Sequence, residues 1–182
     1  MSTTGLSRGL VQVYTGDGKG KTTASIGLAI RAMGSGLRVL MVQFIKSARP
    51  TGEVMAASGF DPGFRIVPTG RGFVGLGARS ESDRESSAEA AAEALVFAWD
   101  CMISGKYDVL ILDEINCAVA LGLVPAEDVL RMIQEKPEGV ELVLTGRSAD
   151  SRILEAADLV TEMREVKHPF RRGVAARRGI EF

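Results

Sequence analysis

Residues Thr15–Thr23 read TGDGKGKTT, and this stretch decides the fold that the sequence predicts. It follows an apolar run over Leu10–Tyr14 that is typical of a strand, and it opens a helical pattern over Lys21–Met33. Glycines let successive backbone N–H groups point inward at an anion, and the start of a helix adds the positive end of its dipole. The segment therefore predicts a phosphate-binding loop between a strand and a helix.

The loop departs by one position from the G-x-x-x-x-G-K-[ST] pattern of such loops. Either Thr15 stands at the first glycine position, or the loop counted from Gly16 is one residue short. In both cases Lys21 places a positive charge on the phosphates, and the hydroxyl of Thr22 reaches a bound Mg²⁺. The alternative is a glycine-rich turn that binds nothing, which Gly-Lys-Thr at a strand-to-helix junction disfavours.

Two acidic residues supply the second half of the expected site. Asp113 and Glu114 follow the strong strand pattern of Tyr107–Leu112, as carboxylates do where a nucleotide-binding fold holds Mg²⁺. Adjacent residues on a strand face opposite ways, so we expect one carboxylate to serve the metal and the other to be structural. A strand end capped by a solvated carboxylate is the alternative.

Strand and helix patterns alternate along the whole chain, which predicts one α/β domain with a parallel sheet and helices on both faces. Glycine-rich Thr69–Ser80 is expected to be a mobile loop. Ligands bind at the carboxyl ends of parallel strands, so we expect the phosphate loop, the acidic pair and Thr145–Arg147 to converge on one edge. The remaining expected strands are 37–45, 64–67, 140–144 and 159–163, and the remaining helices are 82–105, 125–135 and 150–157.

Composition excludes several classes of protein. The 182 residues carry 22 Lys and Arg against 23 Asp and Glu, a net charge of -1 that argues against a dedicated nucleic-acid binder. One histidine, His168, leaves no His-rich metal site, and Cys101 and Cys117 form no CxxC pair. No apolar run approaches the roughly 20 residues of a membrane span. We expect a cytoplasmic protein with no membrane or nucleic-acid partner.

The C-terminal stretch 164–182 is a basic tail, expected to fold over the site or against a second copy of the chain. No residue of the sequence stands out as a general base. A nucleotide site without a base favours chemistry in which a substrate or cofactor brings its own nucleophile.

Five segments together resemble one family, the ATP:corrinoid adenosyltransferases, over nearly the whole chain. They are TGDGKGKTT (15–23), VQFIK (42–46), ILDEI (111–115), TGR (145–147) and VKH (166–168) with the glycines that follow. The resemblance implies a RecA-like P-loop fold and a homodimer. It implies transfer of the 5′-deoxyadenosyl group of Mg·ATP to Co(I) of a reduced corrinoid, with release of triphosphate. It also implies a reductase that supplies Co(I), and ATP bound in reverse along the loop.

The family's functional residues carry over by position. Lys21 and Arg147 are the implied catalytic residues, Thr22 and Glu114 the implied Mg²⁺ ligands, and Arg31 an implied nucleotide contact. Phe73 and His168 are implied contacts near the corrinoid. The triphosphate cradle comprises Thr15, Gly16, Asp17, Gly18, Lys19, Gly20, Lys21, Thr22 and Thr23.

One position departs from the family pattern. Gly75 stands where the family has a tryptophan that packs near the corrin. Two other functions therefore remain open from the sequence: a corrinoid- and ATP-binding module without catalysis, and an ordinary P-loop ATPase or kinase.

Overall fold

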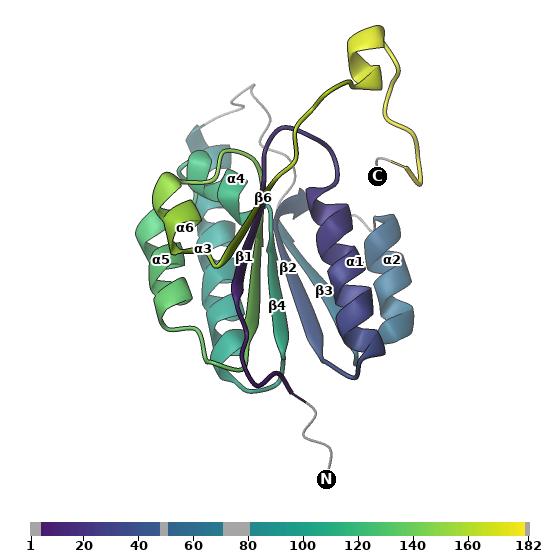
Figure 1. Ribbon diagram of the computed structural model, residues 1–182. Coiled ribbons are helices and arrows are strands. Elements are labelled where there is room, and N and C mark those ends of the chain that lie inside the picture. The colour runs from purple at the N-terminus through teal and green to yellow at the C-terminus, as the bar shows by residue number, and fades with distance from the viewer. Residues whose placement is uncertain (1–4, 48–50, 71–80, 181–182) are drawn as a thin grey trace.

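Six parallel strands form a single sheet in the order β3-β2-β4-β5-β1-β6 (Figure 1). The computed structural model describes residues 5–47, 51–70 and 81–180. The strand bounds are β1 Val11–Thr15, β2 Val39–Ser47, β3 Phe64–Gly70, β4 Val109–Asp113, β5 Glu141–Thr145 and β6 Leu159–Glu162.

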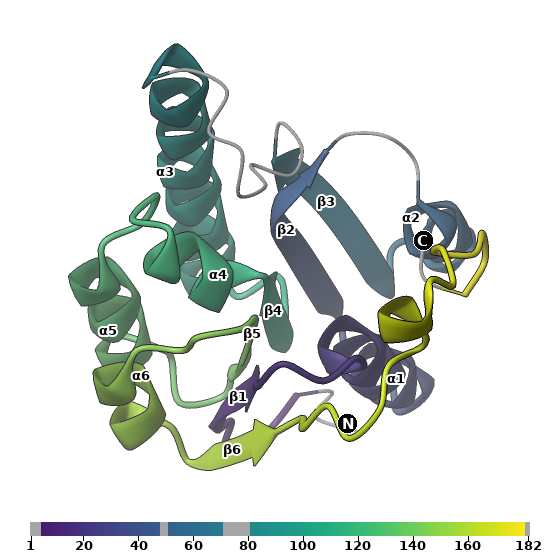
Figure 2. The ribbon, with the colours of Figure 1, turned by 90° about the horizontal axis from the view of Figure 1, so that it is seen from above.

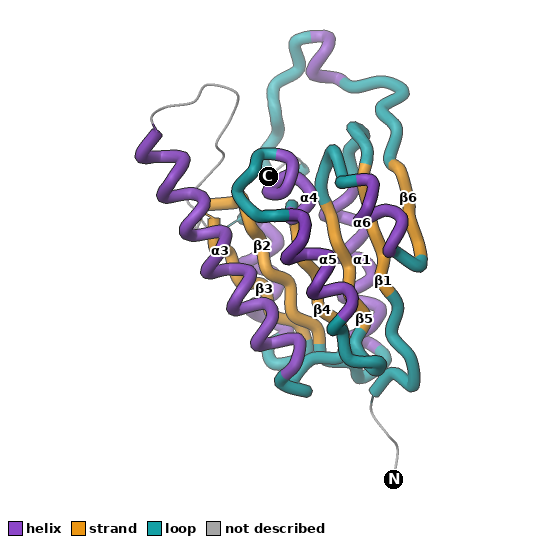
Figure 3. The backbone as a smooth tube through the Cα atoms, turned by 90° about the vertical axis from the view of Figure 1, so that its left-hand side faces the viewer, coloured by secondary structure: helices purple, strands orange, loops and turns teal. Residues whose placement is uncertain are grey.

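Helices cover both faces of the sheet (Figure 2). Helices α1 and α2 lie on one face, and α3, α4, α5 and α6 lie on the other. Figure 3 views the sheet from the side of α3, α5 and α6. Their bounds are α1 Lys21–Gly34, α2 Gly52–Ala57, α3 Glu81–Ile103, α4 Ile115–Ala120, α5 Ala126–Gln134 and α6 Ser151–Ala156, with short 3₁₀ turns at Ser58–Phe60 and Pro169–Arg172. Among the described residues, every helix is too short or too polar to span a bilayer.

The central strands form because they are apolar on both faces. All five residues of β4 (VLILD) are buried, since helices pack against the sheet from either side. One core cluster joins the sheet to α3–α6 and a second joins it to α1 and α2. The predicted parallel α/β sheet is therefore confirmed.

The predicted strands are all present, most of them shifted by one or two residues toward the C-terminus. Two short helices were not predicted, α2 and α4, each six residues long. The expected loop over Thr69–Ser80 begins too early, because Thr69 and Gly70 belong to β3. Residues 71–80, which include Phe73 and Gly75, lie outside the described residues.

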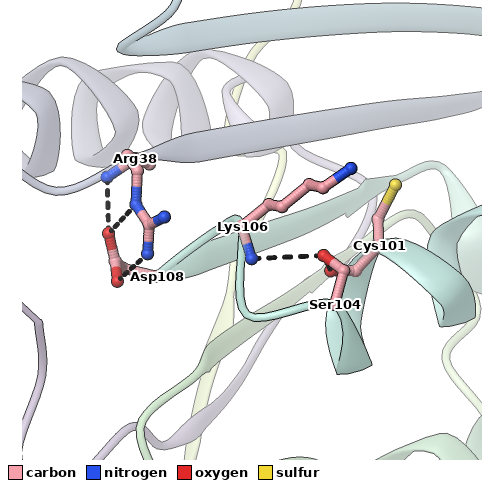
Figure 4. A network of polar contacts seen from close by, with 5 residues as sticks. All are labelled: Arg38, Cys101, Ser104, Lys106 and Asp108. Atoms are coloured by element: carbon pink, nitrogen blue, oxygen red, sulfur yellow. Dashed lines mark hydrogen bonds and ion pairs between the residues drawn. The ribbon is translucent and has the colours of Figure 1, made fainter.

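A charged pair joins β2 and β4 at the amino ends of these strands (Figure 4). The Arg38 guanidinium donates to both carboxylate oxygens of Asp108 at 3.0 Å, and the Arg38 backbone N–H donates to the same carboxylate at 2.8 Å. These bonds favour the charged carboxylate and hold the pKa of Asp108 below its ordinary value. The opposite ends of the same two strands carry the candidate site.

Candidate functional site

The phosphate loop joins the end of β1 to the start of α1. Gly16 and Gly20 have φ angles of 91° and 123°, in the region that favours glycine, and Gly20 is the N-cap of α1. The loop therefore takes its shape from glycines at the two positions where the backbone turns.

A second constraint on the loop comes from the chain after β6. The backbone N–H of Gly18 donates to the carbonyl of Met163 at 2.6 Å, and the N–H of Met163 donates to the carbonyl of Thr15 at 2.8 Å. A Cβ atom at Gly18 would lie 2.6 Å from that Met163 oxygen. Gly18 is thus needed for close packing against residue 163, and nothing in the local sequence indicates this partner.

Lys21 is buried under the loop, with 6% of its surface exposed. Its ammonium donates to the carbonyls of Gly16 at 2.6 Å and Gly18 at 2.8 Å. Burial lowers the pKa of Lys21, the nearby Arg147 guanidinium lowers it further, and the Glu114 carboxylate opposes both effects. The structure therefore places Arg147 close enough to Lys21 to affect its pKa, and these are the two implied catalytic residues.

Asp113 is the centre of a buried hydrogen-bond network. Its Oδ1 accepts from the hydroxyl of Thr22 at 2.8 Å and from the hydroxyl of Thr145 at 2.8 Å. Its Oδ2 accepts from the amide of Gln43 at 3.1 Å. Strand β5 lies between β4 and β1, so Thr145 at its end fills the space between the acidic strand end and the phosphate loop. The predicted convergence of the three polar clusters is confirmed.

Glu114 turns the chain sharply from β4 into α4. It has φ 65° and ψ 18°, the left-handed conformation, and its N–H donates to the hydroxyl of Thr145 at 2.9 Å. The Glu114 carboxylate lies beside the Cys117 thiol. Burial, together with a hydrogen bond to Glu114, raises the pKa of the Cys117 thiol to about 12.

The oxygen atoms at this point fit a Mg²⁺ ion. Hydroxyl and carboxylate oxygens are ligands that Mg²⁺ accepts beside triphosphate. The Thr22 hydroxyl has one proton, which it donates to Asp113, so its lone pairs remain for a cation. Asp113 already accepts from three side chains, whereas the half-buried Glu114 is outside that network.

Other predicted residues of the loop lie around this centre. Thr15 is buried and its hydroxyl accepts from the N–H of Ala149 at 3.4 Å, while Asp17 and Thr23 are exposed. Lys19 is exposed, and its ammonium donates to the carbonyl of Ile180 at 2.8 Å. The basic tail therefore returns to the phosphate loop. This agrees with the expectation that the tail folds over the site.

Two predicted residues are not brought to the loop. Arg31 lies in the last turn of α1, and at 1.5 Å per residue it is about 15 Å along the helix from Lys21. His168 caps the 3₁₀ turn Pro169–Arg172, where its ring accepts from the N–H of Phe170 at 3.2 Å. This turn stands above the sheet in Figure 1, away from the loop. Arg31 and His168 are therefore not among the residues that surround the phosphate loop.

Sequence reasoning missed the role of Gln43 as a direct partner of Asp113. The signal was present, because Gln43 is a polar residue inside an otherwise apolar strand pattern. Its register partner in β4 is Asp113 itself.

Comparison with known proteins identifies the family of the chain. The family described as ATP:corrinoid adenosyltransferase BtuR/CobO/CobP matches residues 7–182. The corrinoid adenosyltransferase of Escherichia coli K12 is 38% identical over 96% of this chain and 86% of its own length. That of Pseudomonas aeruginosa is 37% identical over 96% of this chain and 84% of its own.

A solved structure shares the fold. The flagellar accessory protein FlaH from Methanocaldococcus jannaschii superposes with a TM-score of 0.54, at 14% identity, over 86% of this chain and 72% of that one. At this identity the likeness concerns the fold alone. The match of nearly the whole chain, together with relatives above 30% identity, shows that the chain belongs to the ATP:corrinoid adenosyltransferase family, with ATP and a corrinoid as its substrates.

Proposed function

We propose that Thr15–Thr23 binds the triphosphate of Mg·ATP and that the chain positions C5′ of the nucleotide for attack by Co(I) of a reduced corrinoid. The observation that supports this most is the contact of Thr22, at the end of the loop, with Asp113, at the end of β4. It joins an anion-binding loop to a set of oxygen ligands for a cation.

The reaction balances without an added oxidant or base. The electron pair of Co(I) forms the cobalt–carbon bond to C5′, and the bond between C5′ and the triphosphate oxygen breaks. Cobalt is formally oxidised by two electrons, and triphosphate leaves with the bonding pair. The nucleophile carries its own electron pair, so the protein supplies position and charge rather than proton transfer.

The chain's own residues act on the leaving group. Loop N–H groups and the start of α1 bind phosphate oxygens. Lys21 is the buried positive charge next to them, and Arg147 adds a second charge that lies close enough to lower the pKa of Lys21. Both charges favour departure of a highly anionic triphosphate, since their attraction grows as negative charge develops on it.

We propose Thr22 and Glu114 as the Mg²⁺ ligands and Asp113 as the residue that holds Thr22. When bound, Mg²⁺ supplies further neutralisation of the triphosphate charge. A homodimer and a reductase that delivers Co(I) are also part of the proposal, because the family resemblance implies them.

The test identifies the products under anaerobic reduction. Protein, Mg·ATP and chemically reduced cobalamin are mixed, the spectrum of the adenosylated corrinoid is followed, and the released anion is identified by ³¹P NMR. Intact triphosphate with adenosylated product supports the proposal. ADP and phosphate indicate an ATPase or kinase. ATP binding without product indicates a binding module, in which case Gly75→Trp tests whether the missing tryptophan is the reason.

A further inference from the structure

Gln43 is a buried amide in the middle of β2, level with the carboxyl end of β4. Only 1% of its surface is exposed, and β4 places Asp113 directly beside it in the sheet. Its Nε2 donates to Oδ2 of Asp113 at 3.1 Å, and its backbone carbonyl accepts from the hydroxyl of Thr69 at 2.9 Å. Gln43 on β2 thus connects the carboxyl ends of β3 and β4.

The partner of this amide determines which way it faces. A carboxylate only accepts hydrogen bonds, so the NH₂ group of Gln43 must face Asp113. Asp113 then has one oxygen held by Gln43 and the other facing the hydroxyls of Thr22 and Thr145. The hydrogen bond from Gln43 to Oδ2 fixes the rotation of the Asp113 carboxylate. That rotation in turn sets the direction in which the Thr22 hydroxyl points its proton.

The carbonyl oxygen of the same amide, Oε1 of Gln43, is buried and lacks a hydrogen-bond donor within the described part of the chain. A buried carbonyl oxygen without a donor destabilises a folded protein, because it has lost its hydrogen bonds to water. An O–H donor in the site, such as a water on the cation, would satisfy it.

We propose, as an extension of the Mg·ATP site above, that Gln43 is a positioning residue for the metal. It orients Asp113 so that the Thr22 hydroxyl keeps its lone pairs toward the cation, and its Oε1 is the acceptor for a water held by the cation. Partners of metal ligands contribute about 10–100-fold to metal affinity in other sites. Gln43 is not a catalytic residue in this proposal, because it touches neither substrate.

The experiment measures metal binding rather than turnover. Mn²⁺ replaces Mg²⁺, and its binding to the full-length protein with ATP and no corrinoid is followed by electron paramagnetic resonance of the free ion. The test variant is Gln43→Met, which keeps the side-chain volume and removes both amide groups. The matched control is Gln12→Met, on β1 of the same sheet, whose amide bonds to Glu141 and Tyr14 instead.

We expect Gln43→Met to weaken Mn²⁺ binding by about 10-fold or more, and Gln12→Met to leave it within about twofold. Thr22→Val should weaken binding strongly, and adding Gln43→Met to it should have a smaller effect than Gln43→Met has in the wild type, because the contribution that Gln43 makes through the Thr22 hydroxyl is already lost. A folded Gln43→Met protein with unchanged Mn²⁺ affinity overturns the inference. If Gln43→Met does not fold, as its melting curve would show, Gln43→Leu takes its place with the same criterion.

The two proposals fail in different ways. If Thr22→Val leaves Mn²⁺ binding unchanged, the proposed metal site itself is wrong. If Thr22→Val weakens binding but Gln43→Met does not, or if the two changes are additive, the metal site stands and Gln43 has only a structural role.

Discussion

A single methyl group at Gly18 tests how tightly the phosphate loop is packed against the chain after β6. The Cβ of Gly18→Ala would lie 2.6 Å from the carbonyl oxygen of Met163 and 2.8 Å from the carbonyl carbon of Arg164. Both neighbours are backbone atoms, so they cannot rotate away as a flexible side chain would. The loop and residues 163–164 must therefore separate.

The expected cost follows from three contributions. Overpacking of this kind costs about 1–3 kcal/mol. Separation also weakens the hydrogen bond from the Gly18 N–H to Met163, a further ~1 kcal/mol. Alanine recovers about 0.4–1 kcal/mol by restricting the unfolded chain. The net loss is about 1–3.6 kcal/mol, which for a chain of this length lowers Tm by about 2–14 °C.

Urea unfolding and thermal melting measure this loss, and ATP titration measures its effect on the loop. Gly27→Ala is the matched control, because Gly27 lies in α1 with no atom within 4 Å of an added Cβ. That variant should be unchanged or more stable by about 0.5–1 kcal/mol. A Gly18→Ala protein that is as stable as Gly27→Ala and binds ATP normally would refute the packing described here.

Four further predictions concern charged and titrating groups. Lys21→Ala should lower kcat/KM by roughly 10²-fold, measured as adenosylated corrinoid formed per second, because a preorganised charge is lost. Glu114→Gln should raise the Mg²⁺ concentration for half-maximal rate by about 10-fold or more; an unchanged value removes Glu114 from the metal site. The thiol of Cys117, with its pKa raised to about 12, should be only about 10⁻⁴ thiolate at pH 8 and react with iodoacetamide roughly 10³-fold more slowly than an ordinary cysteine, as peptide mass spectrometry would show. Because the pKa of Asp108 is lowered in the folded state, its contribution to stability is complete above pH ~4 and is lost as the pH falls through the lower folded value. Asp108→Asn should therefore be about 1–2 kcal/mol less stable than the wild type at pH 7, and urea unfolding at successively lower pH should show this difference shrinking.

The architecture was accessible from the sequence because its strongest elements are locally encoded. Buried parallel strands are continuous apolar runs, and the glycines and lysines of Thr15–Thr23 mark a loop between a strand and a helix. Ligands bind at the carboxyl ends of parallel strands, and this rule alone predicts that Asp113 and Thr145 lie next to that loop. Thr22, Asp113 and Thr145 are indeed in direct contact.

Other features of the site could not be predicted from the sequence. The left-handed turn at Glu114 could not be predicted, because Glu is not a residue whose presence indicates that conformation. Helix α4 is too short for its pattern to be distinguished from the strand before it. The implied contact of Arg31 rested on family position alone, and the geometry of α1 carries that residue away from the loop.

The placement of β1 has a consequence for how the polypeptide is made. Both neighbours of β1 in the sheet, β5 and β6, come from the last third of the chain, and Met163 completes the backbone bonds of the loop. During synthesis the first strand emerges from the ribosome without either neighbour and stays unpaired until residues 141–163 have been translated. The phosphate loop therefore reaches its final structure only late in translation. Until then β1 is an exposed, unpaired strand of the kind that chaperones protect.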